Sequence, residues 1–260
     1  MIEGGSYMQL VALTALGIGL STIFGVVIGF MFKEISHKMN DMILGFASGI
    51  MLAAAVLGLI LPSLEYVNNQ GVWMVIIGIF CGAFVLNVLD RLTPHLHSLV
   101  GSENEEAHQK NTALMNKTLL FVLAIAIHNF PEGLATGVSF GTGNVMDAFT
   151  VAAGIALQNI PEGMIVVFPL LASGVSRKRT FMLASFTGVV EVIATFVGYF
   201  AISISSVLLP FLLAFAGGTM LYVISDEMIP ETHAHGHEQL ATYALLVGFC
   251  VMLLMDYCLG

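Results

Sequence analysis

The hexapeptide HNFPEG at residues 128–133 returns thirty positions later as QNIPEG at residues 158–163. Both copies lie inside stretches that are otherwise apolar enough to sit in lipid. A carboxylate at the centre of a bilayer costs about 2.5 to 3.5 kcal/mol on insertion scales, so Glu132 and Glu162 need partners. A metal ion is the nearest partner that can neutralise both carboxylates.

The composition is that of an integral membrane protein. Hydrophobic residues make up 57% of the 260 residues and charged residues only 10%, a balance that one soluble core could not hide. Glu3 precedes the first apolar run and no Lys or Arg does, so this run reads as a retained helix and not as a secretory signal. We predict an all-α, single-domain protein over residues 1–260 with eight transmembrane helices, near 8–32, 42–64, 72–89, 118–140, 146–173, 180–200, 206–229 and 240–258.

The basic residues predict the orientation. With eight spans, every Lys and Arg falls in a loop on one face: Lys33, Lys38, Arg91, Lys110, Lys117, Arg177, Lys178 and Arg179. The positive-inside rule makes this face cytoplasmic, so both termini point outward from the cell (inner) membrane. The longest polar stretch, about residues 93–117, then becomes a cytoplasmic loop.

The net charge of −9 argues against nucleic-acid binding and against an anionic substrate. A cationic substrate fits better. Cys81, Cys250 and Cys258 lie in apolar segments without CxxC spacing and read as packing residues.

The spacing inside each hexapeptide gathers potential ligands on one side of a helix. His128 and Glu132 stand four residues apart, and Asn129 and Glu132 three apart. Gln158, Asn159 and Glu162 repeat this pattern. A short turn at residues 141–144 makes the two helices antiparallel neighbours, so the two faces can meet near mid-membrane. Together they supply an imidazole, two carboxylates and three amide oxygens, a credible set of ligands for a divalent transition metal.

Each hexapeptide also contains a proline. Pro131 and Pro161 lack an N–H and clash with the carbonyls of Ile127 and Leu157, which predicts a kink in each helix. Carbonyls freed inside a membrane need other partners, as is typical of backbone that lines a cavity.

Further polar residues are weaker candidates. Glu191 is a third intramembrane acid, whereas Met51 is one of 15 methionines and most methionines only pack. Glutamates 132 and 162 could also be protonated structural hydrogen-bonding groups, as could Glu191 alone. The loop histidines at 95, 97, 233, 235 and 237 fit a solvated loop as well as weak metal capture. Candidate pathway residues are Glu65, Asp90, Asp226, Glu227, Glu231 and His233, although Asp90 also fits an ion pair with Arg91.

At these motifs the chain resembles the ZIP family (Zrt/Irt-like proteins) of divalent metal transporters, and within it the prokaryotic GufA/ZupT-like branch. The resemblance covers essentially the whole chain. It implies two three-helix units related by inverted topology around helices four and five, a 3+2+3 arrangement. It also implies two metal positions that share Glu132 and Glu162. One position adds Met51, His128 and Gln158, and the other adds Asn129, Asn159 and Glu191.

Two positions depart from the pattern of the family. Many relatives carry His where this chain has Gln158, and the change should relax the preference for zinc. Some two-metal relatives carry an acid at the position of Asn159. With three carboxylates, one divalent ion leaves the site at −3 + 2 = −1 and two ions leave it at −3 + 4 = +1. We therefore expect single occupancy at least as readily as double occupancy.

The sequence thus predicts a carrier that moves Zn²⁺, and also Fe²⁺, Mn²⁺, Co²⁺ or Cd²⁺, into the cytoplasm. The metal is its substrate, no cofactor is expected, and its partners are the lipid bilayer and a possible second copy in a homodimer. A metal-selective channel is the nearest alternative. An intramembrane metallohydrolase would need an HExxH motif or a Ser or Cys nucleophile with a His base, and neither pattern occurs. A metal sensor would need a signalling domain, for which few residues remain.

Overall fold

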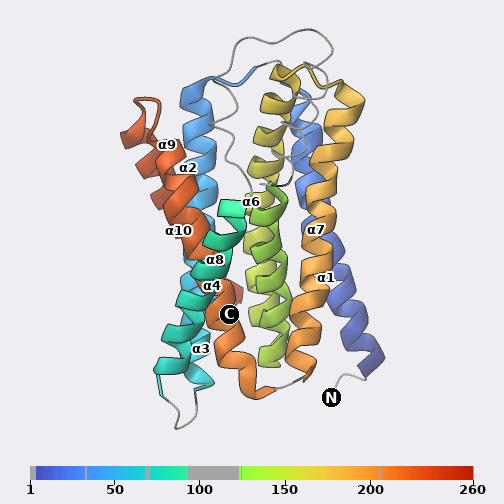
Figure 1. The fold of residues 1–260 in the computed structure, drawn as a ribbon, viewed down its shortest axis with the longest axis vertical. Helices are drawn as coiled ribbons and strands as arrows, with labels where there is room; N and C mark the ends of the chain where they lie inside the picture. Colours follow the sequence, from blue (N-terminus) through green and yellow to red (C-terminus); the bar gives the residue numbers. More distant parts are fainter. Residues whose placement is uncertain are drawn as a thin grey trace.

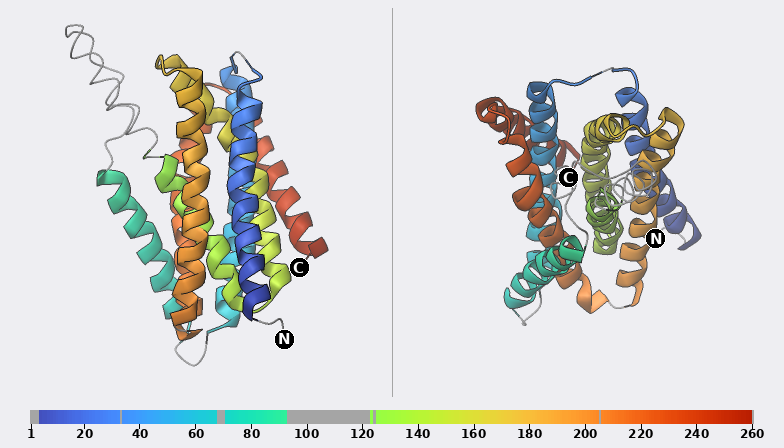
Figure 2. Two further views of the ribbon diagram at one scale, coloured as in Figure 1. Left: turned by 90° about the vertical axis from the view of Figure 1, so that its right-hand side faces the viewer. Right: turned by 45° about the horizontal axis from the view of Figure 1, so that its top comes forward.

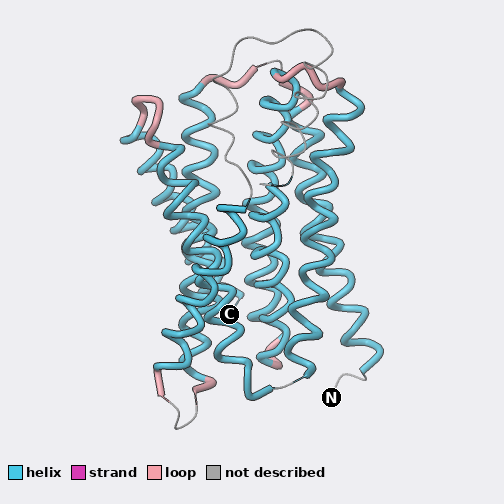
Figure 3. Tube along the Cα trace, viewed as in Figure 1, coloured by secondary structure: helices cyan, strands magenta, loops and turns pink. Residues whose placement is uncertain are grey.

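The protein is a bundle of helices, and no strand occurs among the residues that the structure describes (Figures 1 and 3). The structure is a computed structural model that describes residues 4–32, 34–67, 71–92, 123, 125–204 and 206–259. In chain order the elements are α1 (Gly4–Gly29), α2 (His37–Ala53), η1 (Ala54–Ile60), α3 (Leu61–Glu65), α4 (Trp73–Leu92), a helix over 125–139, η3 (Phe140–Thr142), α6 (Val145–Ala172), α7 (Arg177–Ile204), η4 (Ser206–Leu208), α8 (Leu209–Val223), η5 (Ile224–Met228), α9 (Ile229–Thr232) and α10 (Glu238–Leu259).

These elements confirm the eight predicted helices, because α2 continues through η1 into α3 and α8 continues through η5 into α9. Among the described residues, six helices are long and apolar enough to cross a membrane, and α4 contributes a shorter apolar stretch. The protein is therefore a multi-pass membrane protein. The polar loop predicted at about 93–117, with its histidines, lies outside the described residues.

Two of the long helices contain a wide π-helical turn that the sequence analysis did not predict. In η1 the amide of Leu61 reaches back five residues to the carbonyl of Val56, and in η5 the amide of Ile229 reaches Ile224. Each wide turn ends two residues before a proline, Pro62 or Pro230. Since a proline ring crowds the carbonyl four residues back, a wider turn lets the helix pass it.

The helix over 125–139 and α6 occupy the middle of the bundle (Figures 1 and 2). Around them, α1 packs on α6 and α7, α4 packs on α8, and α10 packs on α2. Pro131 and Pro161 lie inside helices that continue past them, so neither proline ends its helix; the kinks themselves stay predictions.

Charge is distributed unevenly along the long axis of the bundle. Lys38 and the three basic residues of 177–179 lie at the beginning of α2 and α7, at the upper end in Figure 1. Helix α4 runs toward the same end and carries Arg91 in its last turn. Both chain ends lie in the lower half of the view. The described basic residues of α2 and α7 thus share one end, and Arg91 lies on the half of α4 that points toward this end.

Candidate metal site

Two carboxylates with buried oxygens, those of Glu132 and Glu162, lie where the two hexapeptides meet. Glu132 is only 1% exposed, and its Oε1 accepts a hydrogen bond from Nε2 of Gln158 at 2.7 Å. The other oxygen of Glu132 and Oε1 of Glu162 are buried and accept no hydrogen bond from the described residues, and the same holds for Oε1 of Gln158. Unpartnered buried oxygens are costly unless something else satisfies them. All three are acceptors, so a cation fits them and an anion does not.

A cavity of about 130 Å³ lies against these residues. Both hexapeptides contribute to its wall through His128, Asn129, Glu132 and Glu162, and α2 contributes Met51. Drug-sized ligands occupy pockets of about 300–1,000 Å³, so this cavity suits an ion and a few waters better. The structure therefore brings the predicted Met51 to the same cavity as the paired carboxylates.

Glu191 is held differently from the other two glutamates. It is fully buried, and Oε1 accepts hydrogen bonds from the hydroxyl of Thr22, at 2.7 Å, and from the side-chain amide of Asn129. Its Oε2 accepts a third hydrogen bond from Nδ2 of Asn159 at 2.5 Å. Glu191 thus meets the predicted Asn129 and Asn159, but protein donors already satisfy it. Thr22 was missed by the sequence analysis, since a single Thr in an apolar helix carries no signal.

His128 makes a contact that links two predicted residues on different helices. Its Nε2 lies 2.6 Å from Oε2 of Glu227 in η5, and both side chains are about one-quarter exposed, at 26% and 24%. At this distance the ring donates its Nε2–H to the carboxylate. A neutral imidazole then carries its lone pair on Nδ1, and His128 also lines the cavity.

The glycine that ends each hexapeptide lets another helix approach closely. A Cβ on Gly133 would overlap the carbonyl oxygen of Glu191, and a Cβ on Gly163 would overlap that of Thr22. A close contact with a neighbouring helix, typical of small residues in membrane helices, is therefore present at both copies of the motif.

The weaker candidates lie elsewhere. Glu65 is exposed at the end of α3, and Asp226 is exposed and accepts a hydrogen bond from the Tyr222 hydroxyl at 3.2 Å. Nδ1 of His233 lies 2.8 Å from the carbonyl of Ile229, so this ring serves its own loop. Glu231 is partly exposed, and the side chain of Asp90 lies outside the description.

Within the described residues, no three His, Cys, Asp or Glu side chains already surround one point as metal ligands. An ion at the paired carboxylates must therefore draw on amide oxygens, on Met51, or on a shift of side chains. The predicted ligand sets stay predictions.

Comparison with known proteins places the chain among transporters. A family model described as ZIP Zinc transporter matches residues 100–256, more than half of the chain. The chain belongs to the ZIP family. It is 42% identical to the zinc transporter GufA of Myxococcus xanthus over 98% of this chain and 99% of that protein. It is also 37% identical to the zinc transporter ZIPB of Bordetella bronchiseptica, over 92% of this chain and 78% of that protein. It is 35% identical to the zinc transporter ZupT of Chlorobaculum parvum, over 90% of this chain and 91% of that protein.

The ZIP match contains both hexapeptides together with Glu191 and Glu227, because all of them fall between residues 100 and 256. Thr22 and Met51 precede that range and are covered only by the longer matches to individual ZIP relatives. The predicted family membership is thereby confirmed.

Proposed function

We propose that this protein carries divalent transition-metal cations across the cell membrane into the cytoplasm, with Zn²⁺ as the first candidate and Fe²⁺, Mn²⁺, Co²⁺ and Cd²⁺ as further substrates. The observation that carries this proposal is a pair of glutamates, the buried Glu132 and the half-buried Glu162. Each has a buried oxygen that accepts no hydrogen bond from the described residues. A divalent cation satisfies both oxygens at once. Relatives from three bacteria are named zinc transporters, which supports zinc as the first candidate.

The first metal position in this proposal uses Met51, His128, Glu132, Gln158 and Glu162. Support comes from the cavity, which four of these five residues line, and from the unpartnered Oε1 of Gln158. The second position would add Asn129, Asn159 and Glu191. Because three protein donors already satisfy Glu191, an ion reaches this position only by displacing them.

The cavity indicates which way the carrier faces. Its wall includes Leu44 and Thr187, which lie between the paired carboxylates and the basic end of the bundle. On the other side of the carboxylates the core is apolar and closed, with Leu134, Val138 and Ile155 at most 6% exposed. By the positive-inside rule the basic end faces the cytoplasm, so both termini face outward and the cavity faces inward. A cavity that ends at a closed apolar core favours a carrier over a continuous channel.

Pseudo-symmetric contacts support the inverted 3+2+3 repeat. Helices α1 and α7 run in opposite directions (Figure 1) and touch at Gly19 and Gly188. Thr22 and Glu191 follow these glycines by three residues and occupy equivalent places. Gly163 of α6 packs on the carbonyl of Thr22, and Gly133 of the 125–139 helix packs on the carbonyl of Glu191. Wide turns before a proline then recur in the following helix of each unit. Alternating access by two such units is the motion that this arrangement allows.

In this proposal the metal is the substrate and no resident cofactor is required. The protein is one transport domain in contact with lipid, and a homodimer is part of the same proposal. No HExxH motif or Ser or Cys nucleophile paired with a His base supports the alternative of a hydrolase.

The deciding experiment is metal uptake into liposomes that contain the purified protein. Glu162→Ala should reduce saturable Zn²⁺ uptake to near that of empty liposomes, because it removes one of the paired carboxylates. Glu34→Ala is the matched control, since this acid is exposed, does not line the cavity and is not a candidate pathway residue. Unchanged uptake in Glu162→Ala, or an equal loss in both variants, would defeat the assignment.

A further inference from the structure

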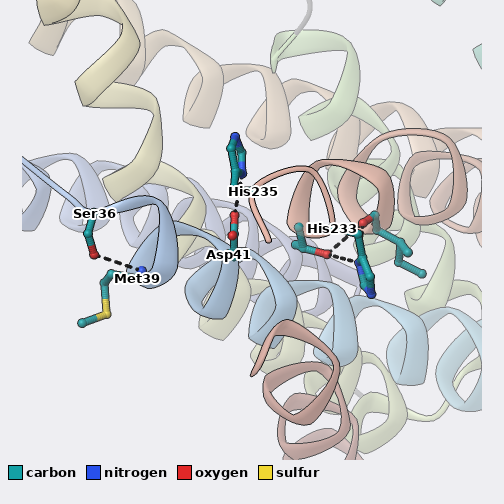
Figure 4. Close-up of polar contacts among 7 residues, drawn as sticks. Ser36, Met39, Asp41, His233 and His235 are labelled. Carbon is teal, nitrogen blue, oxygen red and sulfur yellow. Dashed lines mark hydrogen bonds and ion pairs between the residues drawn. The ribbon is translucent and has the colours of Figure 1, made fainter. Parts of the chain in front are cut away.

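A second group of potential ligands lies at the basic end of the bundle, where the loop between α9 and α10 meets the beginning of α2 (Figure 4). Asp41 on α2 is completely buried, and its Oδ1 lies 2.9 Å from Nδ1 of His235 in the loop. The other carboxylate oxygen, Oδ2, accepts no hydrogen bond from the described residues. A buried acid bound to a single imidazole needs an explanation beyond packing.

The imidazole of His37 completes the group. Its ring stacks on that of His235 with 4.5 Å between the centroids and 25° between the planes. His37 precedes Asp41 by four residues on α2, which places both on one side of the helix. Ser36 caps this helix by accepting a hydrogen bond from the amide of Met39 at 3.3 Å, so the turn that carries His37 is fixed (Figure 4).

The contact with Asp41 decides which nitrogen of His235 can bind an ion. When Nδ1–H is donated to the carboxylate, the neutral ring keeps its lone pair on Nε2, on the far side from Asp41. Metal-binding histidines in proteins almost always donate their other ring N–H to a carboxylate, a carbonyl or a water in this way. In this contact His235 has the tautomer of a ligand. The ring of His37 lies face to face with it, so the exposed His37 side chain must turn before one of its nitrogens reaches an ion on Nε2 of His235.

We propose that His37 and His235 form a binding site for a divalent transition metal at this end of the protein, with Asp41 as the residue that positions His235. The ligand class follows from the donors, since imidazole suits Zn²⁺, Cu²⁺ and Ni²⁺ better than it suits Mg²⁺ or Ca²⁺. Two protein ligands leave the remaining positions to water, so binding is weak and exchangeable.

The position relates this site to the central cavity. Leu44, three residues after Asp41 on the same helix, lines that cavity. The proposed site therefore lies about one helical turn from a residue of the cavity wall. Neighbouring His233 is not part of it, because its Nδ1 lies against the Ile229 carbonyl and its Nε2 lies 3.3 Å from the Thr242 hydroxyl. Metal binding at this site does not depend on transport by the protein, so it can be tested separately.

The test measures Co²⁺ binding to the purified protein by calorimetry and by visible absorption. Glu132→Gln and Glu162→Gln together form the parent background, so that the central site does not contribute. In this background His37→Ala and His235→Ala should each abolish the weak binding of the same Co²⁺ ion. The double variant should lose nothing further, because both residues hold one ion. Asp41→Asn should weaken this ion's binding about tenfold or more, as losses of positioning carboxylates do.

His233→Ala, in the same loop, is the matched control and should bind as the parent does. Binding equal to the parent in both His37→Ala and His235→Ala would overturn the proposal and leave Asp41 a structural partner only. Separate, additive losses in the two variants would also overturn it, since they would mean independent binding events. His37 is exposed, so its variant tests the site even if Asp41→Asn fails to fold.

Discussion

Substitution of Glu227 should weaken metal binding at the central site, although Glu227 is not one of the proposed metal ligands. Oε2 of Glu227 lies 2.6 Å from Nε2 of His128, and this contact leaves the lone pair of the ring on Nδ1. Without the carboxylate the ring can turn or change tautomer, so the binding-competent form of His128 is less populated. Affinity then falls by the fraction of protein that has lost this form.

The contact sets the size of the effect. A hydrogen bond to a charged group contributes about 1.5 to 3 kcal/mol. Here both side chains are about one-quarter exposed, so water replaces part of the lost bond and we take the lower end. About 1.4 kcal/mol corresponds to a tenfold weaker affinity. Glu227→Ala should show this full effect, and Glu227→Gln should show a smaller one because its amide oxygen still accepts the Nε2–H.

Calorimetric titration of the purified protein with Zn²⁺ measures the change. Asp226→Ala, one residue earlier, is the control and should leave the affinity unchanged because this side chain faces Tyr222. A His128→Ala background should abolish the effect of Glu227→Ala, since the carboxylate acts through the ring. Tighter binding in Glu227→Ala would refute the argument, and so would an undiminished loss in the His128→Ala background.

Three further substitutions test the surroundings of the site. Gly163→Ala should lower the unfolding free energy by about 1–3 kcal/mol, a fall of several degrees in thermal scans, because its Cβ would overlap the Thr22 carbonyl. Gly17→Ala, where no atom lies within 4 Å, should cause no fall. Thr22→Val removes the hydroxyl that donates to Glu191 and should lower thermal stability by a comparable amount, measured without metal. Gln158→His should favour Zn²⁺ over Mn²⁺ in competitive liposome uptake, since imidazole replaces an amide oxygen that now accepts no hydrogen bond.

The fold and the central pair of glutamates could be predicted from local sequence patterns. Long apolar runs require helices that satisfy their own backbone in lipid, and this argument predicted the eight helices, six of which are long and apolar enough to cross a membrane among the described residues. The spacing of His128, Asn129 and Glu132 places them on one side of a helix. The short turn at residues 141–144 makes the helix of the second hexapeptide the antiparallel neighbour of this helix. These arguments depend on residues close together in the chain.

The contacts that sequence reasoning missed join residues far apart in the chain. Thr22 reaches Glu191 across 169 positions, and Asp41 reaches His235 across 194. Neither Thr22 nor Asp41 stands in a repeated motif. The wide turns η1 and η5 had a usable signal, because a proline lies two residues after each of them inside a long apolar run.

The hydrogen bonds around the three glutamates bear on how many ions the site holds. Glu132 and Glu162 each keep a buried oxygen that accepts no hydrogen bond from the described residues, so an ion gains these ligands without breaking a protein contact. Glu191 accepts hydrogen bonds from Thr22, Asn129 and Asn159. A second ion that uses Glu191 must displace donors whose bonds contribute about 1.5 kcal/mol or more each. Two divalent ions would also leave the three carboxylates with a net charge of +1, in a region where uncompensated charge is costly. For the proposed metal site both effects favour single occupancy, with Glu191 and its donors joining the helices and the ion between Glu132 and Glu162.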